Sequence, residues 1–392
     1  MPISKKISED MNRASWIRRM FEEGIRLKKE FGPENVFDLS LGNPEIDPPA
    51  KFYEVLKKLV TNPKKGMHRY MPNSGYPETR NAIATQLNKE SKIKFNGSNV
   101  VMTCGAAGGL NVVLKSILNE GEEVIILSPY FVEYVFYIDN HGLKCKIVET
   151  DENFLPDIEK LNKEIGPNTK ALLINTPNNP TGVVYDSTVM KALSDLLKKK
   201  SKEYGSQIYL ILDDAYHKLV YDGAETPCLF DYYPQSIMVA SFSKTLSIPA
   251  ERVGYIAVSP ECADHDEIMG ALAFCNRTLG FLNTPAIMQH IITEAADAMV
   301  DISMYQKKRD FIYKHLTEIG YEVMKPKGAF YIFPKTPIAD DILFTQRLAK
   351  EKVLAVPGAG FGRPGYMRIS FCVEDRVLEG AITGLTKAFG TK

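Results

Sequence analysis

The stretch Ile208-Tyr-Leu-Ile-Leu-Asp-Asp-Ala-Tyr216 places two acids and a tyrosine directly after an apolar run that has the length of a β-strand. Similar runs with β-branched residues recur along the middle of the chain, at Glu123–Leu127, Lys144–Val148, Ala171–Asn175, Ile237–Ala240 and Val253–Val258. Helical patterns lie between these runs. The alternation predicts an α/β fold whose mostly parallel sheet is covered by helices and places ligands at the carboxyl ends of its strands.

The clearest helical pattern covers Thr188–Tyr204, where four apolar residues share one face, namely Val189, Leu193, Leu196 and Leu197. Asp186 or Ser187 is the expected N-terminal cap, and Gly205 is the expected end. The charged N-terminal segment also has a helical pattern, which ends at Gly32-Pro33. Residues 37–49 follow with three prolines and a glycine, so we expect an irregular segment that serves either as a substrate loop or as a plain connector.

The texture of the sequence changes after roughly residue 290. A long helical stretch covers Tyr305–Thr317, and short strands are expected at Gly328–Phe333 and Met367–Phe371. The last helix carries four apolar residues on one face, namely Leu378, Ile382, Leu385 and Phe389. We therefore expect a large domain over residues 46–290, and a smaller α+β domain formed by residues 1–45 and 291–392.

Composition narrows the possible functions of the 392-residue chain. Lys+Arg and Asp+Glu balance at 48 each, so the chain lacks the basic field of a nucleic-acid-binding protein. No apolar run has the length of a membrane span, and the N-terminus lacks the apolar core of a signal peptide. The cysteines lie far apart without a C-x-x-C pair, at Cys104, Cys145, Cys228, Cys262, Cys275 and Cys372. This spacing argues against a metal site and a disulfide framework, and favours a cytoplasmic protein with reduced thiols.

Four polar clusters follow predicted strands, namely Asn175-Thr-Pro-Asn-Asn-Pro-Thr-Gly182, Asp213-Asp-Ala-Tyr216, Ser241-Phe-Ser-Lys244 and Arg252. Each alone has an ordinary explanation, because such residues also form turns, cap helices or face solvent. Together they meet the needs of pyridoxal phosphate. That cofactor requires a lysine amine for a Schiff base, a carboxylate for its pyridine nitrogen, donors to its phenolic oxygen and a cradle for its phosphate.

The sequence resembles the class I/II pyridoxal-phosphate-dependent aminotransferases of the aspartate aminotransferase superfamily, which have fold type I. The resemblance covers nearly the whole chain and rests on motifs in the family's order: Gly42, Tyr70 with Gly75 and Arg80, the Cys104–Gly109 turn, Asn-Pro-Thr-Gly, Asp-x-x-Tyr, Ser-x-Ser-Lys with its distant Arg, and Arg368 in Met-Arg-Ile-Ser. It implies a large domain with a mostly parallel seven-stranded sheet and a smaller α+β domain. It also implies transfer of an amino group between an L-amino acid and a 2-oxoacid, in a homodimer with shared active sites.

The resemblance assigns the catalytic roles to the second and third clusters. Lys244 would hold the cofactor as a Schiff base and then move the substrate's proton. Asp213 would pair with the pyridinium nitrogen, although Asp214 is a competing candidate beside it. Tyr216 and Asn179 would donate to the phenolate oxygen.

The remaining roles concern the cofactor's phosphate, its ring and the substrate. The phosphate would bind the residues Gly105, Ala106, Ala107, Ser241, Ser243 and Arg252, together with Tyr70 from the neighbouring subunit. Alanines stand where the family often has a hydroxyl, so the turn at residue 105 offers backbone N–H groups and the helix dipole. Phe131 would stack on the ring, with Tyr130 as the alternative, and Arg368 would bind the substrate α-carboxylate beside Gly42 and Asn179.

Other functions share part of this pattern. A fold-type-I C–S lyase that performs β-elimination would need nearly the same residues, because the cofactor's electron sink serves both reactions. A transcription regulator with an aminotransferase-like domain would need a helix-turn-helix domain, and the residues before Gly42 are too few for one. A dicarboxylate substrate would require a second cation, for which Arg277 is a candidate; a surface or interface position is the alternative for this arginine.

Overall fold

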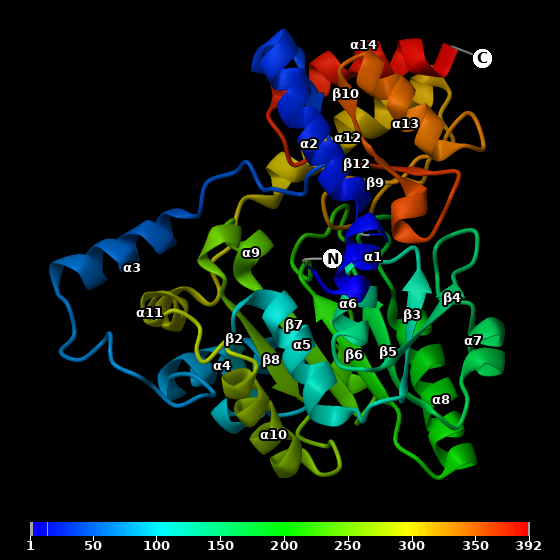
Figure 1. The fold of residues 1–392 in the computed structure, drawn as a ribbon. Coiled ribbons are helices and arrows are strands. Elements are labelled where there is room, and N and C mark those ends of the chain that lie inside the picture. The colour runs from blue at the N-terminus through cyan, green and yellow to red at the C-terminus, as the bar shows by residue number, and fades with distance from the viewer. Residues whose placement is uncertain (1–2, 14, 391–392) are drawn as a thin grey trace.

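The centre of the protein is a seven-stranded sheet with strand order β2-β8-β7-β6-β5-β3-β4 (Figure 1). The computed structural model describes residues 3–13 and 15–390. The strands are β2 (Val100–Thr103), β3 (Glu123–Ser128), β4 (Lys144–Glu149), β5 (Thr169–Asn175), β6 (Tyr209–Asp214), β7 (Ser236–Ser241) and β8 (Gly254–Val258). Among these seven, β8 alone runs in the direction opposite to the other six. The predicted α/β class with a mostly parallel sheet is confirmed.

Side chains along each strand alternate between two buried faces of the sheet, as the pleat requires. One face packs against α5 (Gly105–Ile117), α6 (Glu133–Asp139) and α10 (His265–Thr278). The other packs against α4 (Pro77–Glu90), α8 (Ser187–Tyr204) and α11 (Ala286–Ala295). On β6, Ile211 belongs to the first core and Leu212 to the second. The alternation therefore directs the next two residues, Asp213 and Asp214, to opposite faces.

Helix α8 shows how closely local sequence sets an element. Asp186 caps it, because the carboxylate accepts a hydrogen bond from the Val189 amide at 3.0 Å. Gly205 ends it in the left-handed conformation, with φ of 59°. Two flanking helices complete this part of the chain, α3 (Ala50–Thr61) beside α11 and α7 (Ile158–Glu164) beside α8.

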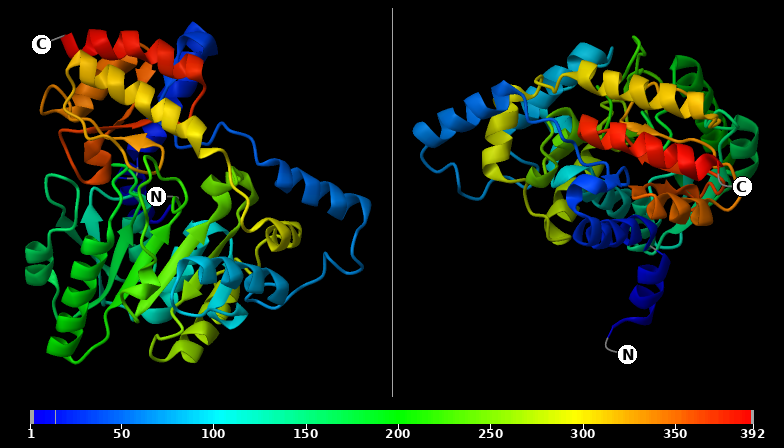
Figure 2. Two further views of the ribbon diagram at one scale, coloured as in Figure 1. Left: turned by 180° about the vertical axis from the view of Figure 1, so that it is seen from behind. Right: turned by 90° about the horizontal axis from the view of Figure 1, so that it is seen from above.

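A second core lies around a three-stranded antiparallel sheet of order β11-β12-β9. Its elements are β9 (Tyr331–Ile332), β11 (Val356–Pro357), β12 (Met367–Ser370), α12 (Ile302–Ile319), α13 (Asp341–Lys350) and α14 (Asp375–Gly390). Figure 2 shows α12 and α14 side by side over this core. The N-terminal helices α1 (Lys5–Arg13) and α2 (Ser15–Phe31) precede it in the chain. The proposed division into two domains stays a prediction.

Two expectations for this region need correction. The segment 37–49 is not wholly irregular, because β1 (Phe37–Asp38) pairs in parallel with β10 (Val353–Leu354) before the first proline of the segment. The strand expected at Gly328–Phe333 shortens to the two residues of β9. Gly328 instead forms an isolated antiparallel bridge with Val220, because the Tyr221 amide donates to the Lys327 carbonyl and the Ala329 amide to the Leu219 carbonyl, both at 2.9 Å.

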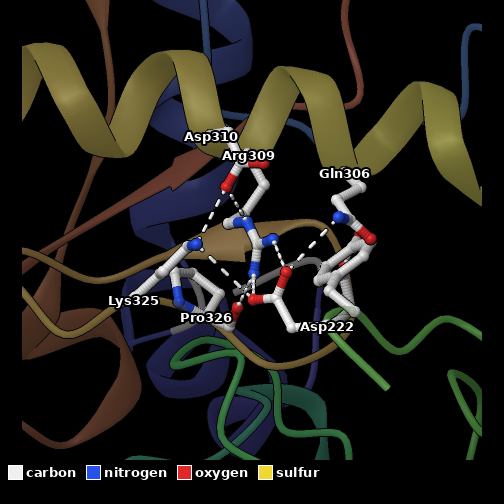
Figure 3. A network of polar contacts seen from close by, with 8 residues as sticks. Asp222, Gln306, Arg309, Asp310, Lys325 and Pro326 are labelled. Carbon is white, nitrogen blue, oxygen red and sulfur yellow. Dashed lines mark hydrogen bonds and ion pairs between the residues drawn. The ribbon is translucent and has the colours of Figure 1, made fainter. Parts of the chain in front are cut away.

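The connection between the two cores runs through the segment that follows β6. Leu219 and Tyr221 are buried in the C-terminal core, and the Tyr221 hydroxyl donates to the Ala329 carbonyl. The fully buried Arg309 of α12 clasps Asp222 with two hydrogen bonds of 3.0 Å (Figure 3). This fork anchors residues 219–222 on the C-terminal core, away from the sheet that β6 belongs to. None of the helices in the described part of the chain is long and apolar enough to cross a membrane.

Candidate active site

A cavity of about 290 Å³ opens at the carboxyl ends of β5, β6 and β7. Apart from Gly105 and Tyr70, its lining contains every residue that the sequence assigns to the site, namely Gly42, Ala106, Ala107, Phe131, Asn179, Asp213, Tyr216, Ser241, Ser243, Lys244, Arg252 and Arg368. Residues from both cores thus meet in one cavity, in the position that parallel sheets offer to ligands.

Lys244 lies in α9 (Phe242–Thr245), a single turn that begins where β7 ends. The helix is capped by Ser241, whose hydroxyl accepts from the Ser243 amide at 3.0 Å. The Lys244 amine donates to the Gly42 carbonyl at 2.6 Å. Burial lowers the pKa of this amine to about 8, and the charges of Arg368 and Arg252 act in the same direction. A larger share of the amine is therefore neutral, and able to act as a nucleophile or base, than for an exposed lysine.

Asp213 and Asp214 stand on opposite faces of β6, which separates the two candidates. Asp213 lines the cavity with Lys244, whereas Asp214 lines a different hollow with Glu90 and His217. The pKa of Asp213 is raised to about 7, chiefly by burial; the hydrogen bond from Tyr134 opposes this shift and the charge of Asp214 adds to it. The Oδ1 atom of Asp213 is buried without a hydrogen-bond partner. An acceptor of this kind suits a cationic N–H group of a ligand.

The C-terminal core contributes a buried guanidinium to the cavity. Arg368 of β12 is 3% exposed, and it donates to the Asn179 side-chain oxygen at 3.1 Å and to the Ser40 carbonyl at 2.6 Å. Its Nε has no partner, and no carboxylate pairs with it among the described residues. Since a guanidinium has five N–H donors, Arg368 retains enough of them to bind a carboxylate in a bidentate fork.

Polar groups suited to a phosphate gather at the start of α5. The Ser241 and Ser243 hydroxyls lie 2.7 Å apart, and Arg252 stands beside the first turn of the helix. A Cβ atom at Gly105 would lie 2.7 Å from the Arg252 Nη2 atom, and the φ of Gly105 is +70°. Only glycine suits this position, because it lets the guanidinium approach the helix N-terminus.

The lining separates Phe131 from Tyr130. Phe131 faces the cavity, whereas Tyr130 packs against Gly362, where a Cβ atom would lie 2.5 Å from its ring. Sequence reasoning missed two tyrosines of this region. Tyr331 contacts the Tyr216 hydroxyl at 3.2 Å and lies under the Arg368 guanidinium. Tyr134 donates to Asp213 at 2.5 Å. Their local sequences carry no signal beyond an aromatic residue in an apolar context.

Tyr70 and the candidate Arg277 lie away from the cavity. Tyr70 is 93% exposed and lines a separate surface hollow with Leu282. Arg277 is exposed at the end of α10, where its guanidinium lies 5.5 Å from the centre of the Phe274 ring. Within one described chain, neither residue reaches Lys244 or Asp213. The cations of the cavity lining are Lys244, Arg252 and Arg368.

The segment that follows β1 lies across the cavity. Leu41 and Gly42 belong to its lining, and a Cβ atom at Gly42 would collide with the Tyr331 hydroxyl. The segment's carbonyls at Ser40 and Gly42 accept from Arg368 and Lys244. Residues 40–42 therefore contact both cationic side chains, which favours a substrate loop over a plain connector.

A cavity lined in this way suits pyridoxal phosphate, and comparisons with known proteins point to a family that uses this cofactor. The sequence profile of the family "Aminotransferase class I and II" matches residues 34–385. The chain therefore belongs to the class I and II aminotransferase family. Its function is that of a pyridoxal-phosphate-dependent aminotransferase, which moves an amino group between an amino acid and a 2-oxoacid.

Relatives resemble the chain over nearly its full length. A probable aspartate aminotransferase of Methanocaldococcus jannaschii is 31% identical, with 90% of this chain and 93% of the relative covered. Aromatic-amino-acid aminotransferase 2 of Thermococcus litoralis is also 31% identical, with 98% and 97% covered. A crystal structure of an amino transferase from Eubacterium rectale has a TM-score of 0.95 and 38% identity, and the match covers 99% of this chain and 98% of that one.

Proposed function

We propose that three buried charged side chains carry out separate steps of amino transfer, namely Lys244, Asp213 and Arg368. The observation that carries the proposal is their meeting in one cavity, with an amine of lowered pKa, a carboxylate oxygen without a partner and a guanidinium without a carboxylate. Among the described residues, the Asp213 Oδ1 atom and the Arg368 Nε atom have no hydrogen-bond partner, and the Lys244 amine has only the Gly42 carbonyl. Buried polar groups in this state mark a binding site, because leaving them unmatched is destabilising.

Lys244 binds the cofactor through its amine and later takes the proton from the substrate Cα at its Nζ atom. The Gly42 carbonyl, 2.6 Å from that nitrogen, holds the amine when it is free. Bound pyridoxal phosphate supplies an electron sink that stabilises negative charge at Cα. Asp213 keeps a proton on the ring nitrogen through its unpaired Oδ1, and Tyr216 and Asn179 donate to the phenolic oxygen.

Other residues hold the phosphate, the ring and the substrate. The α5 N-terminus at Gly105, Ala106 and Ala107 binds the phosphate together with Ser241, Ser243 and Arg252, and the backbone N–H groups of the helix replace a side-chain hydroxyl. Phe131 packs against the ring. Arg368 binds the α-carboxylate of the substrate beside Gly42, whose lack of a side chain leaves room for the Tyr331 hydroxyl.

Borohydride trapping tests the assignment of Lys244. Reduction of the loaded enzyme followed by peptide mapping should place the cofactor on Lys244, and Lys244→Ala should abolish both the trapped product and turnover. Lys218→Ala is the matched control, because Lys218 lies with Glu90 on the opposite side of β6. Trapping on any other lysine in the wild-type enzyme would overturn the assignment.

We further propose a homodimer in which Tyr70 reaches the phosphate site of the neighbouring subunit. Tyr70 is the most exposed of the large apolar side chains that the structure describes, and Leu282 beside it is 44% exposed. Exposed apolar side chains on one surface favour association. A cytoplasmic location is proposed as well, because no disulfide bond forms among the described residues, which include all six cysteines.

A mixed-dimer experiment tests the shared site. Lys244→Ala subunits are combined with Tyr70→Ala subunits, each strongly impaired alone. If Tyr70 acts across the interface, every heterodimer contains one intact site and one doubly altered site, so activity returns. If Tyr70 acts within its own chain, every site keeps one defect. Verified heterodimers without regained activity would contradict the proposal.

A further inference from the structure

The carboxylate of Asp213 has one hydrogen-bond partner among the described residues, and that partner comes from α6. The Tyr134 hydroxyl donates to Asp213 Oδ2 at 2.5 Å, and both side chains are buried, at 2% and 7% exposure. The other oxygen, Oδ1, is unpaired on the cavity side. The carboxylate is thus held at one oxygen by protein and left open at the other.

Packing fixes the Tyr134 ring in the orientation that this bond requires. Its ring meets the Phe131 ring edge to face, with centroids 5.5 Å apart and planes at 83°. Phe131 itself lines the cavity. Tyr134 also belongs to the core between α6 and the sheet. A phenol held in this way has two side-chain torsions already set, so little freedom is lost when it donates to the carboxylate.

We propose that Tyr134 is a positioning residue that turns Asp213 toward the ring nitrogen of the cofactor and keeps its carboxyl ionised. The inference rests on the role proposed above for Asp213. Tyr134 does not belong to the lining of the cavity that contains Lys244, so it acts through Asp213.

The electrostatic surroundings explain why such a donor is needed. Burial is the main cause that raises the pKa of Asp213 to about 7, Asp214 raises it further, and the hydrogen bond from Tyr134 opposes both. The titratable groups near Asp213 also include Tyr137 of α6 and Tyr216, which follows β6. Neither supplies a cation. Without the Tyr134 donor a larger share of the carboxyl would be protonated at neutral pH, and a neutral acid holds the ring-nitrogen proton poorly.

Replacing the hydroxyl while keeping the ring tests the proposal. In Tyr134→Phe, nitrogen NMR of enzyme loaded with isotope-labelled cofactor should show the ring nitrogen shifted toward its unprotonated position. We expect cofactor affinity to fall by roughly tenfold or more, the scale of a hydrogen bond to a charged group. The turnover number should fall with it, while the substrate KM changes little, because Arg368 is untouched.

Tyr233→Phe is the matched control. Tyr233 is equally buried, and its hydroxyl donates to the Ile208 carbonyl at 2.7 Å, next to the opposite end of β6. Its loss removes a comparable hydrogen bond but should leave the nitrogen signal and the cofactor affinity unchanged. An unchanged nitrogen signal in folded Tyr134→Phe would overturn the proposal.

A ring-fluorinated tyrosine at position 134 provides a second test that keeps the hydroxyl and the packing. Its more acidic phenol is the stronger donor, so the nitrogen signal should move toward the protonated position. No movement would count against the proposal even if Tyr134→Phe did not fold. The nitrogen signal of Asp213→Asn separates the two claims. If that signal stays as in the wild type, the role of Asp213 itself is wrong. If it shifts while both changes at position 134 are silent, only the inference about Tyr134 fails.

Discussion

The two faces of β6 place neighbouring carboxyls in contrasting surroundings. Asp213 faces α6 and the cavity, where its contact is a neutral hydroxyl. Asp214 faces α4, where His217 lies 3.5 Å away and is itself 3.0 Å from Glu90. Burial raises the pKa of both carboxyls, to about 7 and about 6 respectively. Both carboxyls are therefore buried, and they differ in that Asp214 has His217 beside it.

This difference supports the proposed roles of the two acids, in which Asp214 is structural and Asp213 binds a ligand. The Asp214 side has its own countercharge, because nearby acids raise the pKa of His217 to about 9 against the opposing effect of burial. Among the described residues, no cation forms an ion pair with Asp213, and its Oδ1 atom has no hydrogen-bond partner. A protonated pyridine ring would complete that side in the way that His217 completes the other.

The largest expected effect separates the two acids by activity. Asp213→Asn should lower the turnover number by roughly 100-fold or more, the usual scale for losing an electrostatic contact to the reacting system. Asp214→Asn should keep most of its turnover. Steady-state kinetics at saturating substrate, on samples with measured cofactor content, provides the comparison. If Asp214→Asn proves the more damaging change, the two faces have been assigned the wrong way round.

A smaller effect concerns the protonated His217. The pKa of His217 in the folded protein lies above its ordinary value. The protonated imidazole therefore stabilises the folded state fully below about pH 6.5, and this contribution to the free energy of unfolding disappears as the pH rises through about 9. His217→Gln should therefore lower the free energy of unfolding by on the order of 3 kcal/mol near pH 6. The difference from the wild type should shrink toward zero at alkaline pH. Urea denaturation across this range measures it.

His141→Gln serves as the control for that measurement. Burial lowers the pKa of His141, which pairs with Asn111 at 3.2 Å instead of with an acid. Its replacement should not show a deficit that grows toward acid pH. A deficit for His217→Gln that is constant with pH would mean that the imidazole acts by packing and hydrogen bonding, without the charge that distinguishes the two faces.

The grouping of the site's side chains in one cavity could be predicted, because most of them directly follow strands that have a regular apolar pattern. The polar clusters after β5, β6 and β7 follow apolar runs that local sequence makes recognisable, and parallel strands bring such ends together. Strand alternation also separates Asp213 from Asp214. Once β6 is known to end at Asp214, the alternation of its side chains places the two acids on opposite faces of the sheet.

What escaped prediction depends on contacts between distant segments. Strands β1 and β10 have two residues each and exist because they pair with one another, so no local periodicity announces them. Tyr331 enters the cavity from a strand of the same length. Tyr134 looks like an ordinary core aromatic, because its hydrogen bond depends on how α6 docks against the sheet. Tyr70 remains apart from the cavity in a single chain.

The Arg309 fork has a mechanical consequence for the cofactor. It ties the segment after β6 to α12, so Tyr216 is packed with the C-terminal core while Asp213 stays with the sheet. A cofactor ring that Asp213 contacts at one edge and Tyr216 at another would be held between the two cores. A rotation of one core relative to the other would change the distance between these two side chains, and the absorption spectrum of the bound cofactor would report the change.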